Sequence, residues 1–424
     1  MANFNFTVRA TDSDGAYADR NFAITINNTR VERYMVVDNI HAYTSPDLVN
    51  WTTRNNQGGW DVSYGNSMWL IATTNATPSA TPQGLASLGG SAYYAKSTFV
   101  VRKSPDGVNF SIINQADMTF LKPDGTAFVV PPVATNYMVN GRLSFSNGFF
   151  WYPMSWGTNY TTTAANYTSY IARSPDGITW TMFASPNKGA FYYDNSQYGH
   201  YFRSFHKVTD SGADLFLPSY GTANGHVGGL YGWKSSDLGA TWTPVIDSTG
   251  KLNNSTAFIS TYLTRINGLY LAANPSSASQ PIMVSNDGYN WSPCNVMANS
   301  IVGQVADIVY ANGTLYAHSF SSTSLSGSYS STLTSTDGIN WTNVTPAGMQ
   351  MSANSPSANN VMTLIYKNGY VIHGQSSAST SSQYPMYYQF AGSADGFVRP
   401  ATPFVGSGTP TPFTYTNGIA AMGS

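Results

Sequence analysis

The chain has 424 residues, of which only 9% are charged, and its formal net charge is −1. Ordinary soluble domains carry about 25% charged residues, so we expect a surface of neutral polar and aromatic side chains. The charge balance gives no electrostatic footprint for nucleic acid or for an anionic membrane, and the single cysteine, Cys294, excludes an internal disulfide and a multi-thiolate metal site.

The first thirty residues predict a β-hairpin. Residues 3–28 read NFNFTVRATDSDGAYADRNFAITINN, with apolar residues alternating on both sides of a DSDG turn. Two strands cannot bury an apolar face alone, so we expect this face to dock on the rest of the chain or on another subunit by strand addition. The stretch resembles the last two strands of Ig-like and cadherin-like modules of tailed-phage structural proteins. That resemblance implies an anchoring segment, residues 1–30.

A short polar box then recurs seven times along the chain. Each box is centred on an aspartate and most end on an aromatic residue, as in SPDGITW at 174–180 and STDGINW at 335–341. The box aspartates are Asp47, Asp106, Asp176, Asp237, Asp287, Asp337 and Asp395. The spacing, about 50–70 residues, suits one four-stranded propeller blade per repeat.

Apolar hairpins with short Asn/Gly turns alternate with the boxes. They occupy residues 63–72, 143–153, 206–218, 262–273, 308–318 and 364–374. Asn-Gly between alternating apolar strands is a strong hairpin signal. The first box has no hairpin before it, but TYTNGIAAMG stands at 414–423. We therefore predict an all-β chain whose residues 31–424 form a seven-bladed β-propeller. Its C-terminal hairpin would supply the two inner strands of the blade that residues 34–53 complete.

The boxes resemble the Asp-box (BNR) repeat of sialidases and many other propellers. Only SSDLGATW at 235–242 matches the family pattern residue for residue; the others are one residue shorter, with Leu48 and Phe110 replacing the Gly and Trp of two boxes. In such a box the aspartate accepts backbone hydrogen bonds and the aromatic residue packs between blades. The resemblance therefore implies a structural role for all seven aspartates.

Candidate glycan contacts lie in the long loops opposite the boxes, where binding sites of rigid scaffolds usually reside. The aromatic candidates are Trp151, Trp156, Tyr160, Tyr192, Tyr193, Tyr198 and Tyr201. The alternative is that these rings only pack the loops. Counting five residues back from each turn asparagine gives a second set, expected at the central mouth: Asp61, Arg142, Tyr262, Asp307 and Thr363. Their charges would form either a polar pocket or a ring that neutralises itself.

The sequence argues against an enzyme. Sialidase chemistry needs a Tyr/Glu pair, and Glu32 is the only glutamate in the chain. A two-carboxylate glycosidase would have to use Asp61 and Asp307, which the repeats place in different blades. The six histidines show no metal-ligand spacing, and Ala23 stands where the DSDG stretch would need the last ligand of a calcium loop. We therefore expect no metal and no cofactor.

The leading hypothesis is a non-enzymatic virion protein of a tailed phage, such as a tail-fibre or receptor-binding component. The hairpin would attach it to other virion proteins, and the propeller would bind a bacterial surface polysaccharide, alone or as a homo-oligomer. The lack of a signal-peptide core leads us to expect localisation in the virion, extracellular after release. The alternatives are a capsid or neck decoration protein, a sialidase-like glycoside hydrolase and an intracellular assembly factor.

Overall fold

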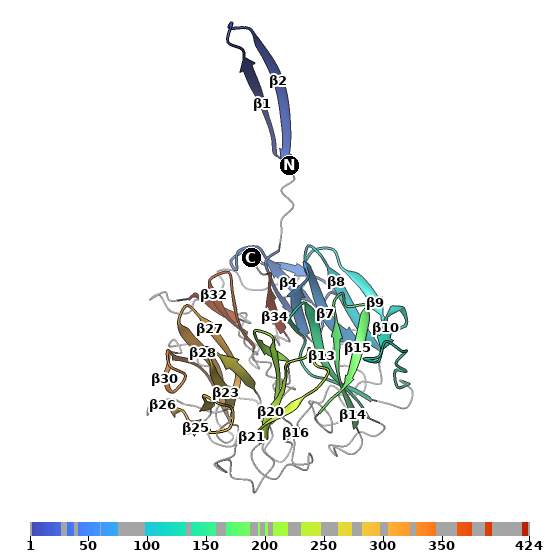
Figure 1. Ribbon diagram of the computed structural model, residues 1–424, viewed down its shortest axis with the longest axis vertical. Coiled ribbons are helices and arrows are strands. Elements are labelled where there is room, and N and C mark those ends of the chain that lie inside the picture. Colours follow the sequence, from blue (N-terminus) through green and yellow to red (C-terminus); the bar gives the residue numbers. More distant parts are fainter. Residues whose placement is uncertain are drawn as a thin grey trace, which may run out of the picture.

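The computed structural model is an all-β molecule in which seven blades form a propeller and a two-stranded ribbon projects from it (Figure 1). The predicted fold class is confirmed. The structure describes residues 2–26, 32–37, 41–59, 61–74, 98–132, 137–157, 167–186, 194–195, 200–201, 207–218, 230–246, 262–273, 282–296, 304–322, 328–344, 363–374, 386–391 and 418–422. Within these ranges the helical content is one 3-10 turn at Gln115–Asp117.

The ribbon consists of β1 (Ala2–Thr11) and β2 (Tyr17–Ile26), which pair antiparallel with Phe6 opposite Phe22. The side chain of Asp12 closes its turn, because its Oδ1 accepts the backbone N–H groups of Asp14 and Ala16 at 3.1 and 2.9 Å. Among the described strands, β1 and β2 pair only with each other. The DSDG stretch is therefore a hairpin turn in this structure.

Three blades have four described strands each, numbered from the inside outwards. Blade 2 contains β6 (Asp61–Gly65), β7 (Met68–Thr74), β8 (Phe99–Ser104) and β9 (Ser111–Asn114). Blade 4 contains β18 (Thr209–Ser211), β19 (Asp214–Pro218), β20 (Leu230–Ser235) and β21 (Thr243–Ile246). Blade 5 contains β22 (Leu263–Ile266), β23 (Leu269–Ala273), β24 (Ile282–Ser285) and β25 (Ser292–Pro293).

Blades 3 and 6 carry an additional strand on their outer edge. Blade 3 contains β11 (Tyr137–Asn140), β12 (Ser144–Ser146), β13 (Phe149–Gly157), β14 (Tyr167–Ser174) and β15 (Thr179–Ala184). Blade 6 contains β27 (Gln304–Ala311), β28 (Thr314–Ser322), β29 (Ser328–Ser335) and β30 (Asn340–Asn343). The added strands, β10 (Thr119–Leu121) and β26 (Asn295–Val296), pair parallel with β15 and β30. They cover edges that would otherwise offer unpaired backbone groups.

Blade 7 contains the described strands β31 (Thr363–Lys367), β32 (Tyr370–Gly374) and β33 (Met386–Phe390). Blade 1 joins the two ends of the chain. Its innermost strand is β34 (Gly418–Ala421), followed outwards by β3 (Tyr34–Val37), β4 (Ala42–Ser45) and β5 (Thr52–Arg54). Tyr34 pairs with both Ala421 and Ser45.

The closure differs from the predicted one in a single strand. The C-terminal segment supplies one inner strand of blade 1 instead of two, because β3 occupies the second position and continues from the N-terminal side. The two chain ends meet where the other blades have a tight turn, and the Met422 N–H donates to the Arg33 carbonyl at 2.8 Å. The prediction of a two-stranded C-terminal hairpin in this blade was therefore wrong.

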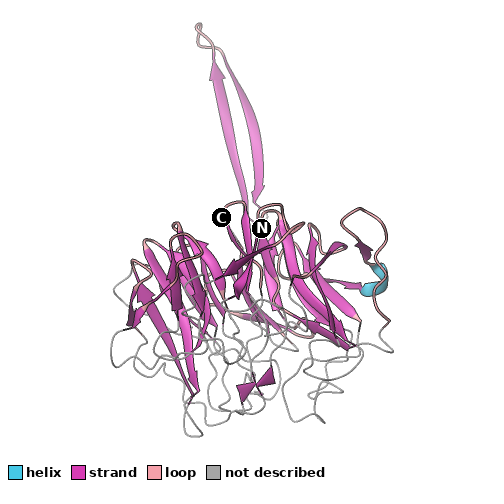
Figure 2. Cartoon of the chain, turned by 60° about the horizontal axis from the view of Figure 1, so that its bottom comes forward, coloured by secondary structure: helices cyan, strands magenta, loops and turns pink. Residues whose placement is uncertain are grey.

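Tight turns join the first two strands of five blades. Asn66, Asn147, Asn267, Asn312 and Asn368 adopt φ values from 46° to 53°, and the residue after each also has positive φ. Two successive left-handed residues are typical of the type I′ turn that suits a twisted hairpin. These turns and the boxes lie on the side of the propeller from which the ribbon emerges (Figure 2); we call it the turn face.

The box aspartates hold their turns by short-range hydrogen bonds. The Asp337 carboxylate accepts the backbone N–H groups of Ile339 and Asn340 at 2.8 Å each, and the hydroxyl of Ser335 at 2.9 Å. The backbone N–H of Asn340 is the largest cause of lowering the pKa of Asp337, to about 2. The other described boxes share this carboxylate-to-backbone pattern, at Asp47, Asp106, Asp176, Asp237 and Asp287. Asp395 lies outside the described residues.

The box tryptophans pack between blades. Trp180 of blade 3 is fully buried and contacts Leu70 and Phe99 of blade 2. Its indole N–H donates to the Gly177 carbonyl at 3.1 Å. Gly177 has φ 76°, and a Cβ there would lie 2.4 Å from a methyl group of Leu70. The box therefore needs glycine for its backbone and for close contact with the preceding blade.

Candidate functional site

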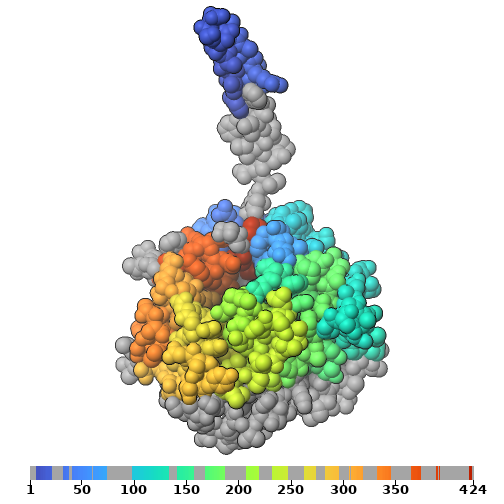
Figure 3. Space-filling view, viewed as in Figure 1, coloured from blue at the N-terminus to red at the C-terminus, as the bar shows by residue number. Residues whose placement is uncertain are grey.

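A cavity of about 210 Å³ lies where the inner strands converge on the propeller axis. Tyr64, Phe145 and Lys367 line it one or two residues before the tight turns, so the cavity is open toward the turn face. Figure 3 shows the surface hollowed there, between the green and the orange parts of the chain. The remaining lining residues are Val62, Ser63, Arg142, Leu143, Ser144, Lys207, Ile365, Ala420 and Ala421.

A break in the inner strand of blade 3 places Arg142 in this cavity. β13 pairs with β12 at one end and with β11 at the other, and Gly141–Leu143 span the gap between them. The Arg142 Nε lies 3.2 Å from Asp61 Oδ2, which also accepts the Leu143 backbone N–H at 2.9 Å. Asp61 is 2% exposed, and this burial raises the pKa of its carboxyl although Arg142 opposes the shift. The pair therefore joins blade 2 to blade 3.

A second buried carboxylate, Asp307, joins three blades. The Lys207 Nζ of blade 4 donates to its two oxygens at 2.9 and 2.8 Å, and the Leu364 N–H of blade 7 donates at 3.3 Å. Asp307 itself belongs to β27 of blade 6 and is 0% exposed. Tyr262 lies beside the pair, with Lys207 Nζ 5.8 Å from its ring centroid. Burial and the Asp307 charge raise the pKa of Tyr262 well above its ordinary value.

The structure brings together the residues that the count from the turns selected. Asp61, Arg142, Tyr262 and Asp307 all lie beside the channel, and Thr363 begins β31 there with its side chain outside the description. Sequence reasoning missed Lys207. The same count applied to Gly212, the first turn residue of the looser hairpin of blade 4, leads to Lys207, but that hairpin lacks the Asn-Gly signal.

Two of the aromatic glycan candidates lie in the interior. Trp151 is 0% and Trp156 is 6% exposed, and each packs in a hydrophobic cluster beside β13. Their alternation along a long strand buried on both faces removes them from the surface. Packing, the alternative considered for these rings, is what the structure shows for both. Of the other candidates, Tyr160, Tyr192, Tyr193 and Tyr198 lie outside the described residues. Tyr201 is described only by its backbone in β17 (His200–Tyr201), which pairs with β16 (Asp194–Asn195).

Two histidines, His318 of β28 and His373 of β32, meet in the core next to this site. Their rings form a hydrogen bond between His373 Nε2 and His318 Nδ1, and both side chains are buried. His318 stands opposite Asp307 in the strand register. Burial lowers the pKa of His318 from 6.5 to about 3. Burial and the neighbouring His318 lower the pKa of His373 well below its ordinary value.

Mild acid is therefore expected to destabilise the fold. The unfolded chain takes up protons below 6.5 that the folded chain does not bind, so stability present above that pH is lost as the pH falls toward the folded pKa. At about pH 5, His318 alone should account for a loss of about 2 kcal/mol, and His373 adds a loss of the same sign. Urea unfolding at about pH 7 and about pH 5 measures the difference. His318→Gln with His373→Gln should flatten it; equal stability of the natural chain at both pH values would contradict the prediction.

Within the described part of the chain, no three His, Cys, Asp or Glu side chains come together as a metal-binding group. The same part contains no helix long and apolar enough to cross a membrane. Cys294 is buried and unpaired, and burial raises the pKa of its thiol to about 11. A thiol with so high a pKa is a poor nucleophile at neutral pH.

No protein-family model matches the chain, and no curated protein matches it either. Similar solved structures include YCF48 from Cyanidioschyzon merolae, with 11% identity and a TM-score of 0.37 over 88% of this chain and 90% of that one. They also include the GH74 xyloglucanase from Xanthomonas campestris (12%, TM-score 0.39, 87% and 45%). A third is the Trypanosoma rangeli sialidase (10%, TM-score 0.38, 89% and 58%). This chain thus spans about half the length of the two hydrolases.

Glycoside hydrolases predominate among these similar structures. That finding contradicts the sequence-based prediction that the protein is not an enzyme, and we withdraw the prediction. At such identities and TM-scores the likeness concerns the fold alone and assigns no substrate or reaction. The protein is a seven-bladed β-propeller, and its structural neighbours include sialidases.

Proposed function

We propose that the protein is a component of a tailed-phage particle, attached through the β1–β2 ribbon, whose propeller binds a glycan of the host surface. The observation that carries the proposal is the one-sided register of the ribbon. Phe6 stands opposite Phe22 and Phe4 opposite Ile24, so the apolar residues of both strands share one face. Phe6 and Val8 are 45% and 48% exposed.

The opposite face of the ribbon is polar and internally paired. Arg9 forms two hydrogen bonds of 2.7 Å with Asp19 across the strands, and its guanidinium lies 4.0 Å from the ring centroid of Tyr17. A two-stranded ribbon is marginally stable by itself and gains stability when a further sheet covers its apolar face. Strand addition to a sheet of a neighbouring particle protein would supply that cover.

Attachment is tested in the virus whose genome encodes the chain. Val8→Asp places a charge on the apolar face, and we expect the amount of this protein in purified particles to fall at least tenfold because a charge would be buried unpaired. Thr11→Asp is the matched control on the polar face and should leave incorporation unchanged. Quantitative immunoblotting of purified particles gives the readout. Equal incorporation of both variants, or absence of the natural protein from particles, would refute attachment through this face.

Glycan binding is tested on a panel of bacterial surface polysaccharides, scoring retained protein and released reducing sugar in the same wells. Retention of the natural protein on one or more polysaccharides supports the proposal. Release of reducing sugar from a retained glycan would add hydrolysis to binding and would make Asp61 and Asp307 the first residues to substitute. A panel without retention and without release would overturn the glycan part and leave an architectural component of the particle.

A further inference from the structure

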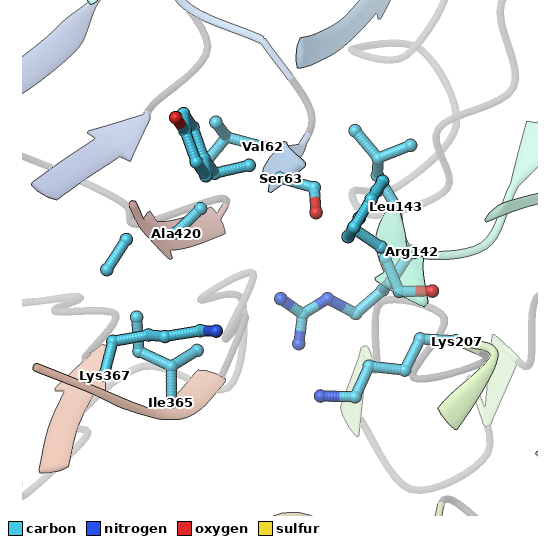
Figure 4. Close-up of a pocket in the computed structure, with 12 residues that line it drawn as sticks. Val62, Ser63, Arg142, Leu143, Lys207, Ile365, Lys367 and Ala420 are labelled. Carbon is cyan, nitrogen blue, oxygen red and sulfur yellow. The ribbon is translucent and has the colours of Figure 1, made fainter. Parts of the chain in front are cut away.

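We infer that the central cavity is a binding site for a small oxyanion-bearing ligand, a carboxylate or a phosphate. Three cationic side chains from three blades reach into it: Arg142, Lys207 and Lys367. Figure 4 shows their nitrogen atoms directed into one common space from different sides. The inference depends on this convergence and not on the attachment or glycan proposals.

The charge balance of the site favours an anion. Asp61 and Asp307 neutralise Arg142 and Lys207 from behind, and neither carboxylate is among the residues that line the cavity. Lys367 is exposed and has no ion-pair partner among the described residues. Asp210, near Lys207 in sequence, accepts the Ser146 hydroxyl at 2.6 Å and does not line the cavity. One positive charge is therefore left over in a recess with low-dielectric walls, which concentrates its field.

Donor geometry supports the same ligand class. An ammonium group has three N–H donors, and Lys207 uses two of them on Asp307, so a third is available. The buried carboxylates hold Arg142 and Lys207 in position before a ligand arrives, which reduces the ordering cost of binding. Ser63 and Ser144 add hydroxyl groups to the lining. The volume of about 210 Å³ is below the roughly 300–1,000 Å³ of sites for drug-sized ligands, so the occupant is small.

Isothermal titration of the full chain with glucuronate, inorganic phosphate and neutral glucose tests the site. We expect one or both anions to bind, glucose to bind more weakly than either, and added salt to weaken anion binding. A preference for glucuronate would identify a carboxylate ligand, and a preference for phosphate a phosphorylated one. No heat of binding for either anion at millimolar concentration would overturn the inference.

Lys367→Gln is the informative variant, because Lys367 is exposed and its loss leaves no buried charge unpaired. We expect it to weaken anion binding about tenfold, the effect of losing one charge-assisted contact. Lys122→Gln is the matched control: it removes the same charge at a position that does not line the cavity. Thermal midpoints of both variants should equal that of the natural protein. Equal anion affinity of the two variants would contradict the assignment, whatever the polysaccharide panel shows.

Discussion

Trp180→Ala should lower the free energy of unfolding by about 3–5 kcal/mol, the usual cost of deleting a fully buried large aromatic side chain. The Trp180 ring meets Phe99 edge-on, with centroids 5.6 Å apart, and fills the space between blades 2 and 3. Its removal leaves a cavity at a contact between blades that is built from apolar side chains. Urea unfolding followed by near-ultraviolet circular dichroism measures the loss.

Trp242→Ala is the control, because Trp242 occupies the same box position and makes the same bond, from its indole N–H to the Gly239 carbonyl at 3.1 Å. Its ring is only half-buried, so the loss should be clearly smaller. Equal losses for the two variants would show that the hydrogen bond to the turn, and not packing between blades, determines the contribution of the box aromatic residue.

Asp307→Ala should cost about 3–5 kcal/mol, the usual effect of removing one partner of a buried ion pair. The substitution leaves the Lys207 ammonium and the Leu364 N–H without their acceptor. Because these groups belong to blades 4 and 7, the ring loses a connection across its axis. Chemical denaturation of the natural chain and the variant, at the same pH and salt, gives the difference.

The double variant Asp307→Leu with Lys207→Met separates pairing from burial. Apolar residues of similar size leave no charge unpaired, so the double variant should recover most of the stability that Asp307→Ala loses. An Asp307→Ala chain that unfolds at the same denaturant concentration as the natural chain would show that water compensates Lys207 fully. The axis contact would then contribute no stability.

How much of the fold the sequence predicts depends on the range of the contacts. Each box closes through bonds that span two to four residues, such as Asp287 to Asn290, and each tight turn needs only Asn followed by a residue that tolerates positive φ. The number of blades could therefore be counted directly. The aromatic residues of β13 show the limit, since the pattern did not separate a strand buried on both faces, which holds Trp151 and Trp156, from a surface loop.

Blade closure and the site show the same division. The sequence placed both chain ends in one blade, but the choice between one and two C-terminal strands depended on whether β3 pairs with β34, a contact between opposite ends of the chain. Sequence counting selected Asp61, Arg142, Tyr262 and Asp307, because a fixed offset from a turn fixes the level along the axis. It could not pair them, since each ion pair crosses between blades.

By itself, then, the sequence determined the all-β class, the seven repeats, the turn chemistry of the boxes and a one-faced N-terminal hairpin, because each follows from local periodicity and turn geometry. Only the tertiary structure decided that Arg142 pairs with Asp61 and that Lys207, 100 residues from Asp307, bonds to it. It also decided that Lys367 joins both cations in one cavity. The physical reason is ring closure, which brings inner strands from distant parts of the chain to a common axis, where burial forces their charges to pair.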